Sequence, residues 1–213
     1  MREAACTQER FLDDVKDHQL EVVKDEDLYR HLKLRRKNKS YLYWIDIITW
    51  PGYLCISSDC GTYVFSRTKD MFCFFRMRDN DFNKLKDRRL NINPGYWSEK
   101  VRGSHNEGIR EYVHERFLEE ITKVYDENFK DRCGTEEKAE ELWEKIDDQV
   151  LSCDQNGYAA HSAAYNFEHE GFEFTDFWET TITEYTFEYL WCCYAIVYAI
   201  EQYDLQKEKT NES

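Results

Sequence analysis

The chain has 213 residues and carries 29 Lys and Arg against 43 Asp and Glu, a formal net charge of −14 at pH 7. Aromatic residues make up 16% of the chain, which excludes an intrinsically disordered acidic protein, since such chains lack the apolar surface that offsets the entropy of ordering. With eight glycines and two prolines, the composition also excludes collagen-like and linker-dominated architectures.

Residues 1–27 are predicted to form an N-terminal helical segment. Apolar residues lie near helical spacing at Phe11, Leu12, Val15, Leu20 and Val23. They predict an amphipathic helix over residues 7–24, broken near Asp17. The segment is charged throughout and lacks the apolar core of a signal peptide, so we expect a cytoplasmic protein.

Residues 28–66 predict an antiparallel sheet of about four strands, inside a β-rich basic region that extends to residue 106. Apolar and polar residues alternate from Leu28, and further strand-like runs follow at 41–50, 53–57 and 62–66. Turn residues separate these runs at 37–40, 51–52 and 58–61. Residues 78–106 are polar and basic and are expected to form a long connection.

The predicted turns define a row of polar residues across this sheet. A turn at 37–40 places His31 opposite Asp46. The next turns place Asp46 opposite Ser57, and Ser57 opposite Thr62. A Ser–His–Asp triad needs its imidazole between hydroxyl and carboxylate, so this order excludes acyl transfer and favours a structural His31–Asp46 pair.

Residues 107–206 are predicted to form an acidic helical region that packs on the sheet, giving one compact α+β domain with a tail at 207–213. Thr135 is the expected N-cap of a helix that extends to Leu151. The last helix, over 183–203, is apolar nearly all round and should be the buried central helix. Its apolar run is about 16 Å long, too short for a bilayer core of about 30 Å.

The net charge is divided unevenly along the chain. Residues 1–106 carry 20 Lys and Arg against 16 Asp and Glu, or +4, and residues 107–213 carry 9 against 27, or −18. The densest acidic stretch, predicted to form one helical face, comprises Glu136, Glu137, Glu140, Glu141, Glu144, Asp147 and Asp148. This face is either a solubilising surface or a mimic of nucleic-acid phosphates that docks a basic protein.

The opposite sign dominates residues 28–102, with 16 Lys and Arg against 7 Asp and Glu, or +9. Cations beside aromatic rings are typical of single-stranded nucleic-acid grooves. The candidate residues for such a groove are Arg35, Arg36, Lys37, Lys39, Lys84, Lys86, Arg88, Arg89, Tyr96 and Trp97. The overall negative charge opposes this interpretation, because it repels polyanions at long range.

Other chemistry has weak support in the sequence. The eight cysteines include no pair at the spacing of zinc or thioredoxin sites, so we expect reduced thiols, no metal and no cofactor. No glycine-rich phosphate loop is present. If the protein instead acts on or sequesters a nucleotide-like phosphate ligand, the candidate residues are His31, Asp46, Asp59 and Arg67.

Several segments carry a family resemblance, namely WPGYL at 50–54, DCGTYVFSR at 59–67, DMF at 70–72, NPGYWSEK at 93–100 and WCCYA at 191–195. In this order the segments resemble a family of uncharacterised phage- and prophage-encoded proteins, over roughly residues 28–204. The resemblance implies an accessory protein of infected cells, with no established reaction. Together with the charge split, it leads to our first hypothesis: a non-enzymatic anti-defence inhibitor, of anti-CRISPR or anti-restriction type. Its partner would be a host protein or protein–nucleic-acid complex.

Overall fold

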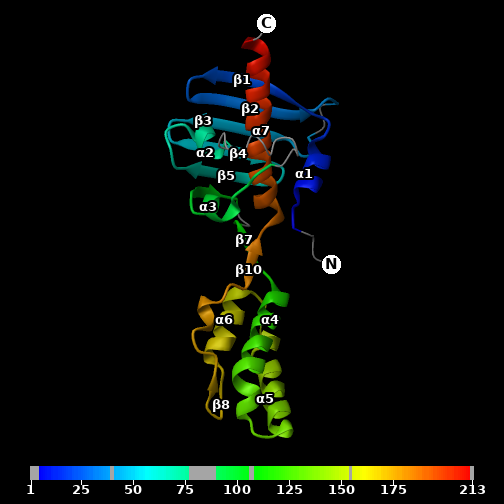
Figure 1. The fold of residues 1–213 in the computed structure, drawn as a ribbon, viewed down its shortest axis with the longest axis vertical. Helices are drawn as coiled ribbons and strands as arrows, with labels where there is room; N and C mark the ends of the chain where they lie inside the picture. The colour runs from blue at the N-terminus through cyan, green and yellow to red at the C-terminus, as the bar shows by residue number, and fades with distance from the viewer. Residues whose placement is uncertain (1–4, 39–40, 77–89, 106–107, 154, 212–213) are drawn as a thin grey trace. The chain divides into compact units, whose positions relative to one another are not determined.

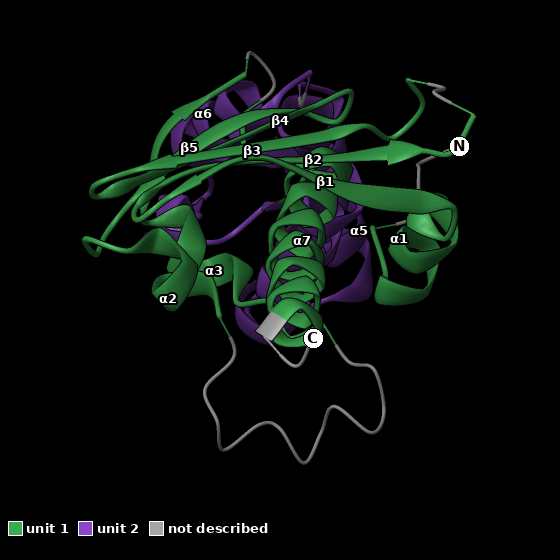
Figure 2. Cartoon of the chain, turned by 90° about the horizontal axis from the view of Figure 1, so that it is seen from above, with its two compact units in different colours: residues 1–109, 185–213 green, residues 110–184 purple. Residues whose placement is uncertain are grey.

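The computed structural model describes residues 5–38, 41–76, 90–105, 108–153 and 155–211. The chain divides into two compact units, shown in different colours in Figure 2: a sheet unit of residues 1–109 and 185–213, and a helical unit of residues 110–184. The predicted α+β class is confirmed. We expected a single compact domain in which residues 107–206 pack on the sheet. The structure differs, because residues 110–184 form a compact unit of their own, whereas the last helix belongs to the sheet unit.

The sheet unit contains a six-stranded antiparallel sheet whose strands follow one another in chain order (Figure 1). The strands are β1 (His18–Glu26), β2 (Tyr29–Arg36), β3 (Ile45–Trp50), β4 (Tyr53–Ser58), β5 (Gly61–Ser66) and β6 (Val101–Ser104). The predicted four strands correspond to β2–β5. The two additional strands lie at the edges of the sheet.

Strand β1 replaces the second half of the helix predicted over residues 7–24. The helical part, α1 (Gln8–Val15), has Thr7 as its N-cap, whose hydroxyl accepts a hydrogen bond from the Arg10 amide. After it, Leu20 and Val22 point into the core, while Glu21 and Val23 are exposed. The period is therefore two, and pairing with β2 holds the segment extended. Strand β6 similarly forms inside the predicted long connection, where it pairs with β5.

One face of the sheet is covered by helices α1, α2 (Met71–Phe75), α3 (Pro94–Ser98) and α7 (Phe187–Asn211), which all lie on the same side in Figure 2. Helix α7 is the predicted central helix, and Tyr189 and Trp191 on it are fully buried. Phe11 of α1 packs against Trp191, with ring centroids 5.2 Å apart. The Trp191 indole also donates a hydrogen bond of 3.1 Å to Asp14.

A charged network joins the end of α7 to strands β1 and β2. Asp25 accepts a hydrogen bond of 2.9 Å from the Tyr203 hydroxyl and pairs with Lys207. Arg30 binds both oxygens of Asp70, at 2.8 and 3.1 Å. Burial acts to raise the pKa of Asp25 and Asp70, but hydrogen bonds from the neighbouring cations outweigh it and hold both pKa values below their usual range. The predicted tail at 207–213 is wrong over residues 207–211, which continue α7.

The turn between β4 and β5 depends on glycine. Gly61 has a φ of +105°, in the region that residues with a Cβ rarely adopt. A Cβ at this position would lie 1.9 Å from Cδ2 of His105. The ring therefore occupies the space that only glycine leaves open, and its Nε2 lies 3.2 Å from the Tyr63 hydroxyl.

The helical unit has a core of its own. Its elements are β7 (Arg110–Tyr112), α4 (His114–Val124), the π-helical turn η2 (Tyr125–Phe129), η3 (Lys130–Arg132), α5 (Glu136–Gln149), η4 (Leu151–Cys153), α6 (Gly157–Asn166), β8 (Glu168–His169), β9 (Phe172–Glu173) and η5 (Phe177–Glu179). Strand β10 (Thr183–Tyr185) pairs with β7, and its last residue belongs to the sheet unit. Phe117, Ile121 and Ile146 are fully buried where α4 and α5 face each other. Thr135 is the N-cap of α5, as predicted, and accepts a hydrogen bond from the Lys138 amide.

Candidate functional site: an acidic helix with an aromatic groove

The helical unit carries the whole negative excess of the chain. Residues 110–184 contain seven Lys and Arg against 21 Asp and Glu, a formal charge of −14. The remaining residues contain 22 of each sign and are neutral overall. The charge split along the chain therefore follows the division into two units more closely than the predicted boundary at residue 106.

Helix α5 presents the predicted acidic face to solvent. Its buried side consists of Ala139, Leu142 and Ile146, and this amphipathic spacing turns the carboxylates outward. All seven are exposed: Glu136, Glu137, Glu140, Glu141, Glu144, Asp147 and Asp148. None of them forms an ion pair with another residue that the structure describes. Their charges are therefore available to a partner.

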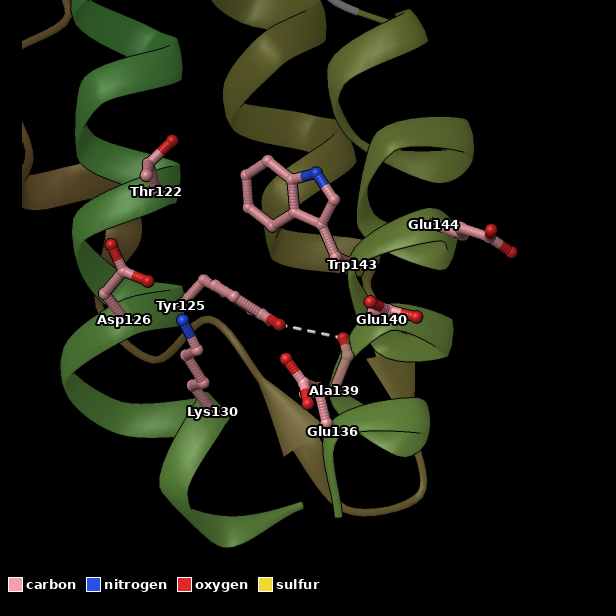
Figure 3. Close-up of a pocket in the computed structure, with 9 residues that line it drawn as sticks. All are labelled: Thr122, Tyr125, Asp126, Lys130, Glu136, Ala139, Glu140, Trp143 and Glu144. Atoms are coloured by element: carbon pink, nitrogen blue, oxygen red, sulfur yellow. Dashed lines mark hydrogen bonds between the residues drawn. The ribbon is translucent and has the colours of Figure 1, made fainter. Parts of the chain in front are cut away.

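A groove of about 500 Å³ lies between α5 and the junction of α4 with η2, shown in Figure 3, and we name it the Trp143 groove. Its lining comprises Thr122, Tyr125, Asp126, Lys130, Glu136, Ala139, Glu140, Trp143 and Glu144. The helix leaves the α-helical repeat at η2, where Tyr125 and Asp126 lie, and such π-helical turns are frequent at functional sites.

Two aromatic rings form the apolar part of the groove. The rings of Tyr125 and Trp143 lie 4.8 Å apart between centroids, at 59° to each other. The Tyr125 hydroxyl donates a hydrogen bond of 2.8 Å to the Ala139 carbonyl, which fixes its ring between the helices (Figure 3). Tyr125 is only 8% exposed, and burial raises the pKa of its hydroxyl, which is therefore a neutral donor at pH 7.

This arrangement suits a cation. Aromatic faces attract cations through the negative face of the ring, and carboxylates nearby add charge attraction. Sequence reasoning found three of the groove carboxylates, Glu136, Glu140 and Glu144, but missed the two rings. The only signal in the sequence was a tryptophan inside an otherwise acidic helix, and the tyrosine that faces it comes from another helix.

The residues of the enzyme hypothesis do not converge on one site. The register of β2 with β3 places Lys33 opposite Asp46 and His31 opposite Ile48, so the predicted opposition of His31 and Asp46 is wrong. The connection between these strands is longer than the predicted turn, because β3 begins only at Ile45. The predicted pairing of Asp46 with Ser57, and of Ser57 with Thr62, is confirmed.

Asp46 nevertheless lies between the side chains of Arg35 and His31, on the face of the sheet opposite α7. Its carboxylate is 2.9 Å from Arg35 Nη2 and 3.4 Å from His31 Nε2. Arg35 also donates to the carbonyl of Ile45, at 2.7 Å. Arg35 of β2 thus forms hydrogen bonds with two neighbouring residues of β3, so this cluster links the two strands.

The two remaining candidates of that hypothesis have local partners elsewhere. Asp59 accepts a hydrogen bond of 2.8 Å from the Tyr43 amide. Arg67 donates to the Tyr96 hydroxyl at 3.4 Å. The four candidates thus occupy three separate places and do not form a catalytic arrangement.

One of the two aromatic rings in the predicted nucleic-acid groove, that of Trp97, is buried. Trp97 is 6% exposed and packs on Phe75 with ring centroids 4.9 Å apart, so it is unavailable for stacking on a base. Tyr96 is exposed, but Lys100 Nζ lies 4.5 Å from its ring centroid. Arg36 donates to the Asp14 carbonyl at 3.2 Å, and Lys37 is exposed. Five of the predicted cations lie outside the described residues: Lys39, Lys84, Lys86, Arg88 and Arg89.

Comparison with known proteins found no matching family model, no matching curated protein and no matching solved structure. In the described part of the chain, no three His, Cys, Asp or Glu side chains group where they could hold a metal ion. No described helix is long and apolar enough to cross a membrane. All eight cysteines are free thiols.

Proposed function

We propose that this protein is a non-enzymatic binding protein that docks a basic protein surface through its helical unit. The observation that carries the proposal is the concentration of the entire net charge of −14 in residues 110–184, with the α5 carboxylates exposed and without ion-pair partners among the described residues. Such a field accelerates encounter with a cationic partner and repels anionic ones.

The partner that we propose is a host protein or complex that itself binds nucleic acid. Such proteins neutralise phosphates with clusters of Lys and Arg, and an acidic helix competes for the same cations. The resemblance to phage- and prophage-encoded proteins supports an anti-defence role, in which the acidic unit blocks the nucleic-acid surface of a host defence complex. We propose that it acts in the host cytoplasm, without a cofactor.

Affinity capture from a lysate of the host cell tests this function. We expect a nucleic-acid-binding protein to be retained at 50 mM salt, released at 500 mM salt, and displaced by added DNA that competes for the same surface. Capture that is insensitive to both salt and DNA would contradict the proposal.

Two triple variants with equal charge changes provide the control. Neutralising Glu137, Glu141 and Asp148 on α5 as amides should abolish capture. Neutralising Glu9, Asp17 and Glu21 in the sheet unit removes the same charge from equally exposed positions and should leave capture intact. Equal losses in both variants would show that net charge alone, rather than the helical unit, is responsible.

A further inference from the structure

The Trp143 groove contains features that a purely solubilising acidic surface does not require. Two rings that are held by packing and by the Tyr125–Ala139 hydrogen bond line the groove beside four carboxylates, Asp126, Glu136, Glu140 and Glu144. The exposed acidic face of α5 continues directly from this groove, since Glu136, Glu140 and Glu144 belong to both. A partner docked on α5 therefore reaches the groove.

We propose that the Trp143 groove binds an arginine side chain of the basic partner, with the guanidinium stacked on the Trp143 indole and paired with the groove carboxylates. This inference rests on the proposed function, and it specifies which side chain of the basic partner the helical unit binds. The volume of about 500 Å³ is within the range of small-molecule pockets, so the groove has room for an arginine side chain.

Arginine fits the groove better than lysine for a physical reason. A guanidinium is planar and weakly hydrated, so it stacks on an aromatic face while its edge donates two parallel hydrogen bonds to a carboxylate. An ammonium group is compact and strongly hydrated, and it gains less from a ring. The groove offers a ring for the planar face of the guanidinium and carboxylates for its N–H donors.

The groove also contains one cation of its own. Lys130 lines it, yet forms no ion pair with a described carboxylate. A guanidinium that enters must share the carboxylates with this ammonium group. Removal of the Lys130 charge should therefore strengthen arginine binding, which separates the groove from the rest of the acidic face.

Two labelled peptides of equal charge, hexa-arginine and hexa-lysine, test the proposal by fluorescence anisotropy with the full chain at low salt. We expect hexa-arginine to bind about 10-fold more tightly, the size of a cation–π contribution at a partly desolvated site. Trp143→Leu should remove this preference and leave hexa-lysine binding unchanged, and Trp143→Phe should restore part of it. Lys130→Met should tighten hexa-arginine binding by at least twofold.

A pair of double variants controls for charge. Glu136→Gln with Glu140→Gln removes two groove carboxylates, and Glu137→Gln with Glu141→Gln removes two at the same spacing outside the groove. We expect the first pair to weaken hexa-arginine binding at least fivefold more than the second.

The outcomes separate the two proposals. If neither peptide binds, the proposed function fails and the groove inference fails with it. If both bind equally and Trp143→Leu changes nothing, the acidic docking surface is supported and the arginine groove is overturned. The indole NH resonance of Trp143 in the wild-type chain adds a readout that needs no folded variant: it should shift on titration with hexa-arginine, and an unmoved resonance would also overturn the inference.

Discussion

Replacement of Gly61 with alanine tests how the turn between β4 and β5 is held. The φ of +105° at this residue costs a side chain with a Cβ about 1–2 kcal/mol. The added Cβ would also lie 1.9 Å from Cδ2 and 2.4 Å from Nε2 of His105, so the imidazole must move away. It then loses its contact of 3.2 Å with the Tyr63 hydroxyl, a hydrogen bond worth about 1 kcal/mol. The hydroxyl retains the Gly108 carbonyl as an acceptor, at 3.2 Å, so it is not left without a hydrogen bond.

Gly52 provides the matched control. It also has a positive φ, +87°, but a Cβ there would have no atom within 4 Å. We therefore expect Gly52→Ala to reduce the free energy of unfolding by about 1–2 kcal/mol and Gly61→Ala by about 2–3 kcal/mol. The difference of about 1 kcal/mol measures the displacement of His105.

Urea denaturation at 25 °C, followed by tryptophan fluorescence and far-UV circular dichroism, gives these free energies for the sheet unit. The same two variants are then made in a His105→Ala background. There the added Cβ of Gly61→Ala meets no ring, so both glycine variants should cost the same. If both glycine variants lose the same free energy of unfolding in the wild-type background, His105 does not constrain Gly61. The same conclusion follows if Gly61→Ala still costs more than Gly52→Ala in the His105→Ala background.

Three further predictions follow from burial and charge. The pKa values of Asp25 and Asp70 are lowered in the folded chain, so the stabilisation from these carboxylates is present above about pH 4 and is lost as the pH falls through the folded pKa values. Urea midpoints measured from pH 6 to pH 2 should show this loss of stability. The loss should be smaller in Asp25→Asn. Trp97→Ala should destabilise the sheet unit by about 3–5 kcal/mol, as thermal unfolding will show; an intact fold combined with lost binding to single-stranded DNA would instead restore Trp97 as a stacking residue. In native buffer Cys73 should react with a thiol reagent within minutes, whereas Cys192 is buried and its pKa is raised by desolvation, so its reaction should wait for unfolding; equal rates would contradict the burial.

The central strands were predictable because their signals are local. Aromatic and β-branched residues mark β3, β4 and β5, and the short turns at Gly52 and Gly61 set their registers. The register of β2 with β3 was mispredicted by two residues, because the longer connection before Ile45 does not define which residues face each other. The register of β2 with β3 is therefore set by packing and not by the length of the connection.

The edge strands show where local patterns become ambiguous. Leu20 fits a helical period with Val23 as well as an extended period with Val22, and β1 is decided by pairing with β2. Strand β6 lies in a polar stretch with no strand pattern of its own and is decided by pairing with β5. Both edge strands therefore depend on pairing with an adjacent strand, which the residues of the edge segment alone do not specify.

The sequence by itself determined the α+β class, the acidic helix with its N-cap at Thr135, and the buried last helix, since composition, capping and periodicity are properties of single segments. Only the tertiary structure decided that the chain leaves the sheet unit at residue 110 and returns to it at residue 185, which concentrates the net charge of −14 in one unit. Only the tertiary structure also brought Tyr125 to Trp143. The physical reason is that both results depend on which surfaces bury each other, and burial joins residues that are distant along the chain.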